Sequence, residues 1–216
     1  MPNPTRRDLM LRGLSLIGSA AGLTLLGASP ALAQGVAPDA LIRRITDEVI
    51  GIVKTDAEIQ AGNLPKIKVL VDAKVLPHVN FPRMTAIAVG RAWRGASAAQ
   101  RDQLMAEFKT LLLRTYAGAL TQVKDQTVDF KPMRARADDA EVVVRTEIRG
   151  RGDPIQLDYR LEKTAEGWKI YDVNVLGVWL ADTSFKSQFA PVVASGGIDA
   201  LISSLTELNR KAGAGS

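Results

Sequence analysis

The residues that could do acid–base or nucleophilic chemistry are few in this sequence of 216 residues, and they are scattered along it. His78 is the only histidine, and its Leu-Pro-His-Val segment contains no Ser, Asp or Glu that could orient it. A histidine acts as a general acid or base when a partner fixes its position and its protonation state. We therefore expect a structural or surface role for His78 rather than a catalytic one.

The carboxylates do not form an evident catalytic pair. Asp138 and Asp139 are adjacent in a predicted turn, where neighbouring side chains usually point apart into solvent. Asp158, Glu162 and Asp172 lie on predicted strands, and the first two belong to the polar side of an alternating pattern. Carboxylates on that side are expected to pair with cations of neighbouring strands. The candidate partners are Arg145, Arg149 and Arg160.

Motifs for nucleophilic, metal and phosphate chemistry are also missing from the sequence. Ser195-Gly-Gly and Ser203-Ser204 lack the strand–turn–helix context of a nucleophile elbow. The sequence has no cysteine, which excludes disulfides, thiol catalysis and thiolate metal sites. It contains no glycine-rich phosphate loop and no metal-ligand spacing. The sequence thus predicts no catalytic residue, no metal site and no cofactor.

The pattern before position 127 is helical. Apolar residues recur at intervals of three and four, and prolines mark where helices begin or stop. Ser97 and Gln100 form a capping box that opens the longest of these helices. Four helices are expected, over residues 39–61, 65–76, 82–93 and 98–123.

From Thr127 the period of the apolar residues changes to two, which is the signature of half-buried strands. One strand begins at Val128 and Phe130, and Val142–Ile148 alternates in the same way. The clearest alternation lies in 154–180, where Glu166-Gly167 reverses the chain into a second strand, Trp168–Val175. The strand before this turn has an apolar side and a polar side. The apolar side consists of Ile155, Leu157, Tyr159 and Leu161, and the polar side of Gln156, Asp158, Arg160 and Glu162.

The order of these elements predicts the fold class. After Leu180 two further helices are expected, separated by Gly196-Gly197. The pattern predicts one α+β domain in which an antiparallel sheet of about four strands packs against several helices. Many small side chains lie on the helix faces, so the space between sheet and helices can be a filled core or an apolar cavity. These residues are Ala86, Ala88, Ala92, Ala106, Ala117, Gly118 and Ala119.

Residues 1–33 have the features of a signal peptide. Arg6 and Arg7 provide a positive start, Leu14–Ala28 is an apolar run, and Ala31-Leu32-Ala33 offers a cleavage site. The Thr-Arg-Arg-Asp-Leu-Met segment also resembles a twin-arginine export signal. A membrane anchor is the alternative, but the run is shorter than the ~20 residues of a spanning helix. We expect export, a mature domain over residues 34–216 and a disordered tail over 212–216.

The charge of the chain argues against a nucleic-acid partner. Removing the three arginines and one aspartate of residues 1–33 lowers the net charge from +5 to +3. The mature chain has no basic run and little aromatic interleaving. A modest positive charge is suited to contact with anionic lipid surfaces or acidic partner proteins.

Several segments together resemble the MlaC family, also called the toluene-tolerance family. They are Leu-Pro-His-Val-Asn-Phe from Leu76, Ala-Val-Gly-Arg-Ala-Trp from Ala88, Ser-Ala-Ala-Gln-Arg-Asp-Gln-Leu-Met-Ala-Glu-Phe from Ser97, Gln156–Leu161, Trp-Lys-Ile-Tyr-Asp-Val-Asn-Val-Leu-Gly-Val from Trp168, and Gly-Gly-Ile-Asp-Ala-Leu-Ile from Gly196. Each segment is weak alone, whereas the set is specific and extends from about Asp39 to Leu208.

The resemblance implies a monomeric periplasmic carrier that holds a phospholipid by its acyl chains in a cavity between sheet and helices. It implies two membrane partners, an inner-membrane ABC transporter with an MCE-domain subunit and an outer-membrane lipoprotein complex. Together they would maintain the lipid asymmetry of the outer membrane. Another apolar cargo, such as a hopanoid, is the first alternative. Two rivals from other classes are an enzyme that uses Asp172 or His78 in an apolar pocket, and an envelope interaction protein with a filled core.

The candidate lipid-binding residues are apolar or aromatic and lie on the predicted inward faces of helices and strands. For each of them ordinary core packing is the competing interpretation. The set is Val71, Val75, Ile87, Leu112, Tyr116, Val142, Val144, Leu157, Tyr159, Val173, Val175, Val178 and Phe189.

Overall fold

Two of the N-terminal helices of the domain begin at polar caps. The computed structural model describes residues 36–133, 135–136, 138–150 and 152–214, so the predicted signal peptide lies outside the described residues. Asp56 accepts hydrogen bonds from the backbone N–H groups of Glu58 and Ile59 and thereby starts a new helix. The predicted helix 39–61 is therefore two helices, α1 (Pro38–Thr55) and α2 (Ala57–Gln60). Asn63 caps the third, α3 (Leu64–Lys74).

The second helical group ends in the longest uninterrupted helix. After the 3₁₀ turn η1 (Leu76–His78), Asn80 caps α4 (Phe81–Val89). Gly90, at φ 73°, then allows the chain to enter the 3₁₀ segment η2 (Gly90–Gly95). The capping box of Ser97 and Gln100 is present and starts α5 (Ala98–Leu120), which confirms that prediction.

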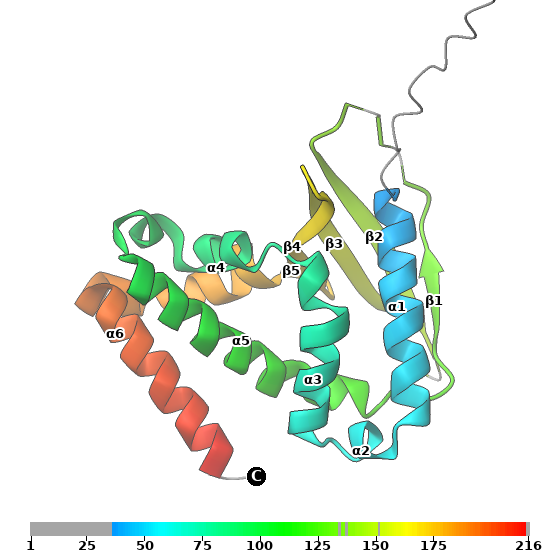
Figure 1. Cartoon of the computed structure of the whole chain (residues 1–216), viewed down its shortest axis with the longest axis horizontal. Coiled ribbons are helices and arrows are strands. Elements are labelled where there is room, and N and C mark those ends of the chain that lie inside the picture. Colours follow the sequence, from blue (N-terminus) through cyan, green and yellow to red (C-terminus); the bar gives the residue numbers. More distant parts are fainter. Residues whose placement is uncertain (1–35, 134, 137, 151, 215–216) are drawn as a thin grey trace, which may run out of the picture. The chain divides into compact units, whose positions relative to one another are not determined.

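The sheet is antiparallel throughout and its strands follow each other in chain order (Figure 1). It consists of β1 (Thr127–Phe130), β2 (Glu141–Arg149), β3 (Ile155–Thr164), β4 (Gly167–Val175) and β5 (Val178–Trp179). It has one strand more than the expected four, because Leu176 and Gly177 turn the chain back at positive φ onto the end of β4. A register shift between Arg160 and Leu161 bends the β3–β4 pair.

The C-terminal helices begin directly after the sheet. A π-helical turn, η3 (Leu180–Phe185), leads into α6 (Lys186–Ala214). The predicted break is present at Gly197, whose φ of 70° and ψ of −159° interrupt the helix. The stretch Leu180–Gly213 is long and apolar enough to cross a membrane by length and composition alone. The helix also continues to Ala214, into the segment 212–216 that was predicted to be a disordered tail.

The buried apolar residues form three clusters rather than one core. The helical cluster joins α4, α5, η3 and α6 around Phe108, whose ring centroid lies 4.9 Å from that of Phe185. The sheet cluster packs α1 on the sheet, and the α1–α3 cluster joins those helices to α5. Half-buried residues, Val49, Val79 and Val173, connect one cluster to the next. The core is therefore continuous through half-buried residues, with the sheet and the helices each providing a part.

Candidate functional site

One face of the sheet carries the apolar side chains of β2, β3 and β4, and we call it the apolar face. At one end of it α1 places Leu41, Ile42 and Ile45 on the strands. Leu161 and Val144 are 0% and 1% exposed there. This covered end consists of Val142, Val144, Leu161 and Ile170, which pair across the strands.

The other end of the apolar face is not covered in this way. Along β3 the exposed fraction rises from 0% at Leu161 to 42% at Ile155, although the alternation is unbroken between Ile155 and Tyr159. Val178 of β5 is 44% exposed, and Leu176 in the adjoining turn is 65% exposed. We call the following set the uncovered end: Ile148, Ile155, Leu157, Val175 and Val178. None of these five residues belongs to any of the three clusters of described residues.

The helices present half-buried apolar residues as well. Val71 and Val75 lie at the end of α3, Leu112 and Tyr116 lie on α5, and Ile87 lies on α4. Leucine and valine side chains that belong to a filled core are normally inaccessible to water. This set packs at the margins of the three clusters and stays partly accessible from outside.

The thirteen predicted lipid-binding residues are thus distributed over the molecule. Nine are half-buried: Val71, Val75, Ile87, Leu112, Tyr116, Leu157, Tyr159, Val173 and Val175. Val142, Val144 and Phe189 are buried and Val178 is exposed. The structure brings Val142, Val144, Tyr159 and Val173 together in the sheet cluster, whereas Ile87 and Phe189 pack in the helical cluster.

Tyr159 lies at the middle of the apolar face, between Val144 and Val173 on the neighbouring strands. Its side chain is only partly buried, yet burial raises the pKa of the Tyr159 phenol well above its ordinary value. The hydroxyl also interacts with those of Thr46 and Thr146. Tyr159 is half-buried, between buried Leu161 and exposed Ile155 on the same strand, so it marks the transition between the two ends. Tyr116 on α5 is also half-buried, and burial raises the pKa of its phenol.

The opposite, polar face of the sheet corrects two sequence predictions. Asp158 was expected to pair with an arginine across the sheet, and this is wrong. It is buried, and its carboxylate accepts hydrogen bonds from the Thr146 N–H and the Gln156 amide. Among the described residues no ion pair joins Asp158 to the three expected arginines. The backbone donor of β2 satisfies this buried carboxylate instead.

Glu162 was also expected to pair within the sheet, but its partners come from the start of α4. Arg83 bonds Glu162 with Nη1 and Glu141 with Nη2, and Asn80 donates to Glu162. The Arg83 guanidinium also stacks on the Tyr171 ring, 3.7 Å from its centroid. Hydrogen bonding from Arg83 holds the pKa of Glu141 below its ordinary value. This Arg83 network ties α4 to the covered end of the sheet.

No local sequence pattern indicates the Arg83 network. Arg83 is one of many cations, and it is 58 and 79 residues away from its two carboxylate partners. The parallel bridge between Val79 and Ile170 and the bond from the Asn80 N–H to the Ile170 carbonyl attach the chain before α4 to β4 and bring them together. A local pattern contains no information on such a contact.

Asp172 was the candidate acid of the enzyme hypothesis, and its surroundings are those of a helix cap. It is 0% exposed, and its carboxylate accepts hydrogen bonds from the backbone N–H groups of Val173, Ala181 and Asp182. Burial raises the pKa of Asp172, and Arg160 lies 3.6 Å from its Oδ2 atom. The carboxylate thus fixes the start of η3 against β4.

His78, the other candidate of that hypothesis, lies in η1 beside basic side chains. Burial, followed by the charges of Arg44 and Lys169, lowers the pKa of its imidazole. Within the described part of the chain, no three His, Asp or Glu side chains are grouped so that they could hold a metal ion.

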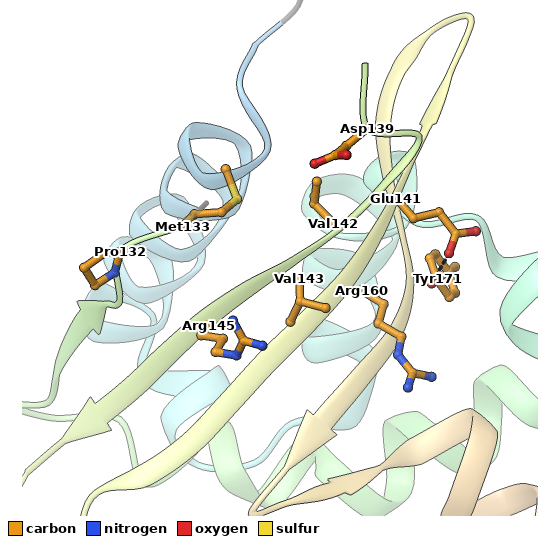
Figure 2. A pocket seen from close by; sticks show the side chains of 9 residues that line it. All are labelled: Pro132, Met133, Asp139, Glu141, Val142, Val143, Arg145, Arg160 and Tyr171. Atoms are coloured by element: carbon orange, nitrogen blue, oxygen red, sulfur yellow. Dashed lines mark hydrogen bonds between the residues drawn. The ribbon is translucent and has the colours of Figure 1, made fainter. Parts of the chain in front are cut away.

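A hollow of about 780 Å³ lies at the β1 side of β2. Figure 2 shows Pro132 and Met133 on one side of it and the β2 residues Val143 and Arg145 on the other. Glu141, Arg160 and Tyr171 complete its polar side (Figure 2). With two arginines and two carboxylates in its lining, this pocket is unsuited to acyl chains, and it is distinct from the uncovered end of the apolar face.

A profile of the MlaC protein family matches residues 43–207. The chain belongs to the MlaC family. The matched region begins within α1 and ends within α6, so it includes all five strands and both ends of the apolar face.

Relatives of this MlaC chain agree with that assignment. The chain is 24% identical over 174 residues to the intermembrane phospholipid transport system binding protein MlaC of Haemophilus influenzae, covering 79% of this chain and 81% of the relative. It is 26% identical over 181 residues to the toluene tolerance protein ttg2D of Pseudomonas putida, covering 82% and 83% of the two chains.

The fold is similar to that of a solved phospholipid-binding protein of Ralstonia solanacearum in complex with a phospholipid. The two proteins are 45% identical, with a TM-score of 0.78, over 81% of this chain and 98% of that one.

Proposed function

We propose that this MlaC protein is a periplasmic carrier that binds a phospholipid by its acyl chains along the uncovered end of the apolar face. The observation that carries the proposal is the rise in exposure along one continuous apolar face, from 0% at Leu161 to 42% at Ile155. A relative that is 45% identical was solved with a bound phospholipid, which supports the same class of cargo here.

The cost of exposing lipid tails to water explains why such a carrier is needed. Each methylene group removed from water is worth about 0.8 kcal/mol, and a diacyl phospholipid exposes tens of them. A phospholipid therefore needs an apolar enclosure while it crosses an aqueous compartment. Transfer from a bilayer to a protein replaces one apolar environment by another, so binding can remain reversible.

The carrier acts by binding and not by catalysis in this proposal. Asp172 is engaged by three backbone donors, and burial together with nearby cations lowers the pKa of His78. Neither residue belongs to the uncovered end, so the two candidate acids and bases are not placed beside the lipid. Replacement of either is expected to leave lipid binding intact.

The partners in this proposal are an inner-membrane ABC transporter with an MCE-domain subunit and an outer-membrane lipoprotein complex. The name of the Haemophilus relative, an intermembrane phospholipid transport system binding protein, supports two membranes as donor and acceptor. Export by the predicted signal peptide would bring the monomeric protein to the periplasm between them. The transport step is tested by following a labelled phospholipid from the protein to vesicles that contain either complex.

The binding step is tested by native mass spectrometry of the exported protein, purified from its own envelope without detergent. One phospholipid per chain is the expected result, and lipid extraction then identifies the head group. A protein without any adduct, even after incubation with phospholipid vesicles, would contradict the proposal. A hopanoid-like mass would retain the carrier and replace its cargo.

A further inference from the structure

The β1 edge of the sheet is only half paired. β1 opposes the C-terminal half of β2, from Thr146 to Arg149. Lys131 still donates its N–H to the Arg145 carbonyl at 3.0 Å, and Pro132, which has no N–H, follows. Among the described residues the N-terminal half of β2, Glu141–Val144, therefore pairs with a strand on its β3 side alone. We call this half the free edge.

The backbone of Val143 points toward the open side of the free edge. Successive residues of a strand direct their N–H and C=O groups to opposite sides. The Arg145 carbonyl accepts from Lys131 on the β1 side, and the Ala140 carbonyl accepts from Lys163 on the β3 side. Val143, two residues from Arg145, must direct both of its groups to the β1 side. No hydrogen bond to these groups is found from the described residues.

The polar pocket lies at this free edge. Its volume of about 780 Å³ is within the ordinary range of ligand sites, ~300 to 1,000 Å³. Pro132 and Met133 form the wall where a longer β1 would have continued, and Val143 and Arg145 form the opposite wall (Figure 2). The space is therefore bordered by unsatisfied strand backbone on one side and by apolar side chains on the other.

Among the charged residues of the pocket, Arg145 forms no ion pair with a described residue, although Asp139 also lines the pocket and buried Asp158 lies opposite Arg145 on β3. Glu141 is bound by Arg83 and Tyr171, and Arg160 is paired with Asp182 at 3.2 Å. Arg145 is exposed, and within the described part of the chain no carboxylate lies within ion-pair distance of it. A ligand that satisfies this pocket needs a negative charge near Arg145.

We propose that the free edge binds an extended peptide segment of a protein partner, which adds to the sheet as a short strand beside β2. The peptide backbone bonds the N–H and C=O groups of Val143, and one of its carboxylates pairs with Arg145. Addition of a strand to a sheet edge is an established mode of peptide recognition, with backbone bonds for affinity and side-chain contacts for specificity. This inference does not rest on the lipid proposal, because the free edge is separate from the uncovered end.

Two substitutions test the two parts of this site, and each has a matched control. Val143→Pro removes the N–H that faces the pocket and leaves the bonds of β2 to β3 in place, a position where a strand tolerates proline. Its control is Val143→Ala, which shortens the same side chain and keeps the N–H. Arg145→Glu reverses the unpaired charge, and Arg91→Glu makes the same charge change at an exposed residue that does not line the pocket.

The experiment selects binders for the exported protein from a library of random peptides and measures their affinity by fluorescence anisotropy. Selected peptides should carry an Asp or Glu, and their affinity should fall about tenfold or more with Val143→Pro and with Arg145→Glu. The two control variants should bind as the unchanged protein does. Hydrogen exchange provides a direct readout, because peptide binding should slow exchange of the Val143 amide.

Three results would overturn the proposal. The first is that no selected peptide depends on Val143 or Arg145. The second is protection of the Val143 amide that rises with protein concentration, because a second copy would then occupy the edge. The third is protection of that amide by phosphatidylglycerol vesicles alone, because the anionic group at Arg145 would then be a lipid head group. If Val143→Pro does not fold, Arg145→Glu and the exchange measurement decide the question.

Discussion

The two ends of the apolar face have similar residues and opposite surroundings. At the covered end Val144 and Leu161 are packed under α1, whereas Leu157 and Val175 at the uncovered end belong to no cluster of the described residues. The residues at both ends are aliphatic, so the difference comes from what lies over them. One end of the face stabilises the fold, and the other end is available for a ligand.

The polar face of the covered end is also held by a helix. At the covered end Arg83 of α4 binds both Glu141 and Glu162. These two glutamates occupy opposite positions on the neighbouring strands β2 and β3. This end of the sheet is thus held from both faces, by α1 on one side and by α4 on the other.

The largest expected effect is the loss of stability when a leucine of the covered end is truncated. Leu161→Ala should lower the free energy of unfolding by about 2–5 kcal/mol, because it leaves a cavity beneath α1. Leu157→Ala, the matched change at the uncovered end, should cost less than half as much. Urea unfolding of both variants measures the difference, and equal losses would contradict the division of the face into two ends.

Enlarging a side chain should lower the free energy of unfolding at the covered end and the amount of bound lipid at the uncovered end. Val144→Phe overfills a packed site and should lower the free energy of unfolding by about 1–3 kcal/mol. Leu157→Phe has room and should change it by less than about 1 kcal/mol, since partly exposed sites tolerate substitution. The amount of lipid that co-purifies should fall with Leu157→Phe. An unchanged lipid content in this folded variant would remove Leu157 from the binding surface.

Removal of the Arg83 network should weaken the covered end from its polar side. Arg83→Met leaves the partly buried Glu162 without its cation and should destabilise the protein by about 1–2 kcal/mol. Replacing Glu162 by Gln as well should recover part of the loss in a double-mutant cycle. Full additivity of the two substitutions would show that the pair does not couple α4 to the sheet.

The smallest effect concerns pH and His78. Burial and nearby cations lower the pKa of His78 in the folded protein below its ordinary value of 6.5. Below pH 6.5 the unfolded chain therefore binds a proton at His78 more readily than the folded protein does. Stability should therefore fall as the pH drops from 6.5 toward the lowered pKa, and His78→Gln should reduce that slope. Urea midpoints at several pH values measure it, and an identical slope in the variant would assign the pH dependence to other groups.

Much of the fold could be predicted from local patterns. The alternation at Ile155–Leu161, the capping box at Ser97 and the helix break at Gly197 each depend on a few adjacent residues, and each is present in the structure. The break at Asp56 was missed, because an aspartate within an apolar pattern is compatible with either a helix interior or a cap.

The arrangement of the site could be predicted only in part. The alternation of β3 is the same at Leu157 and Leu161, so the sequence could not tell which end α1 covers. The partner of Glu162 was wrong for a related reason, because α4 approaches the polar face through contacts far apart in the chain. The partners of Asp158 lie within the sheet, where the Thr146 N–H and the Gln156 amide bond its carboxylate in place of an arginine. The thirteen candidate lipid-binding residues remain a prediction. Their exposure separates the half-buried residues and exposed Val178, which a ligand can reach, from the buried residues Val142, Val144 and Phe189.

The central claim is tested most directly with a phospholipid that carries a photoreactive diazirine in its acyl chain. The lipid is loaded onto the exported protein and irradiated, and the labelled residues are then identified by mass spectrometry. The account predicts labels at the uncovered end, around Leu157 and Val175, and on the facing part of the helices around Leu112 and Tyr116. Labels confined to the polar pocket at Val143 and Arg145, with none on the apolar face, would contradict it.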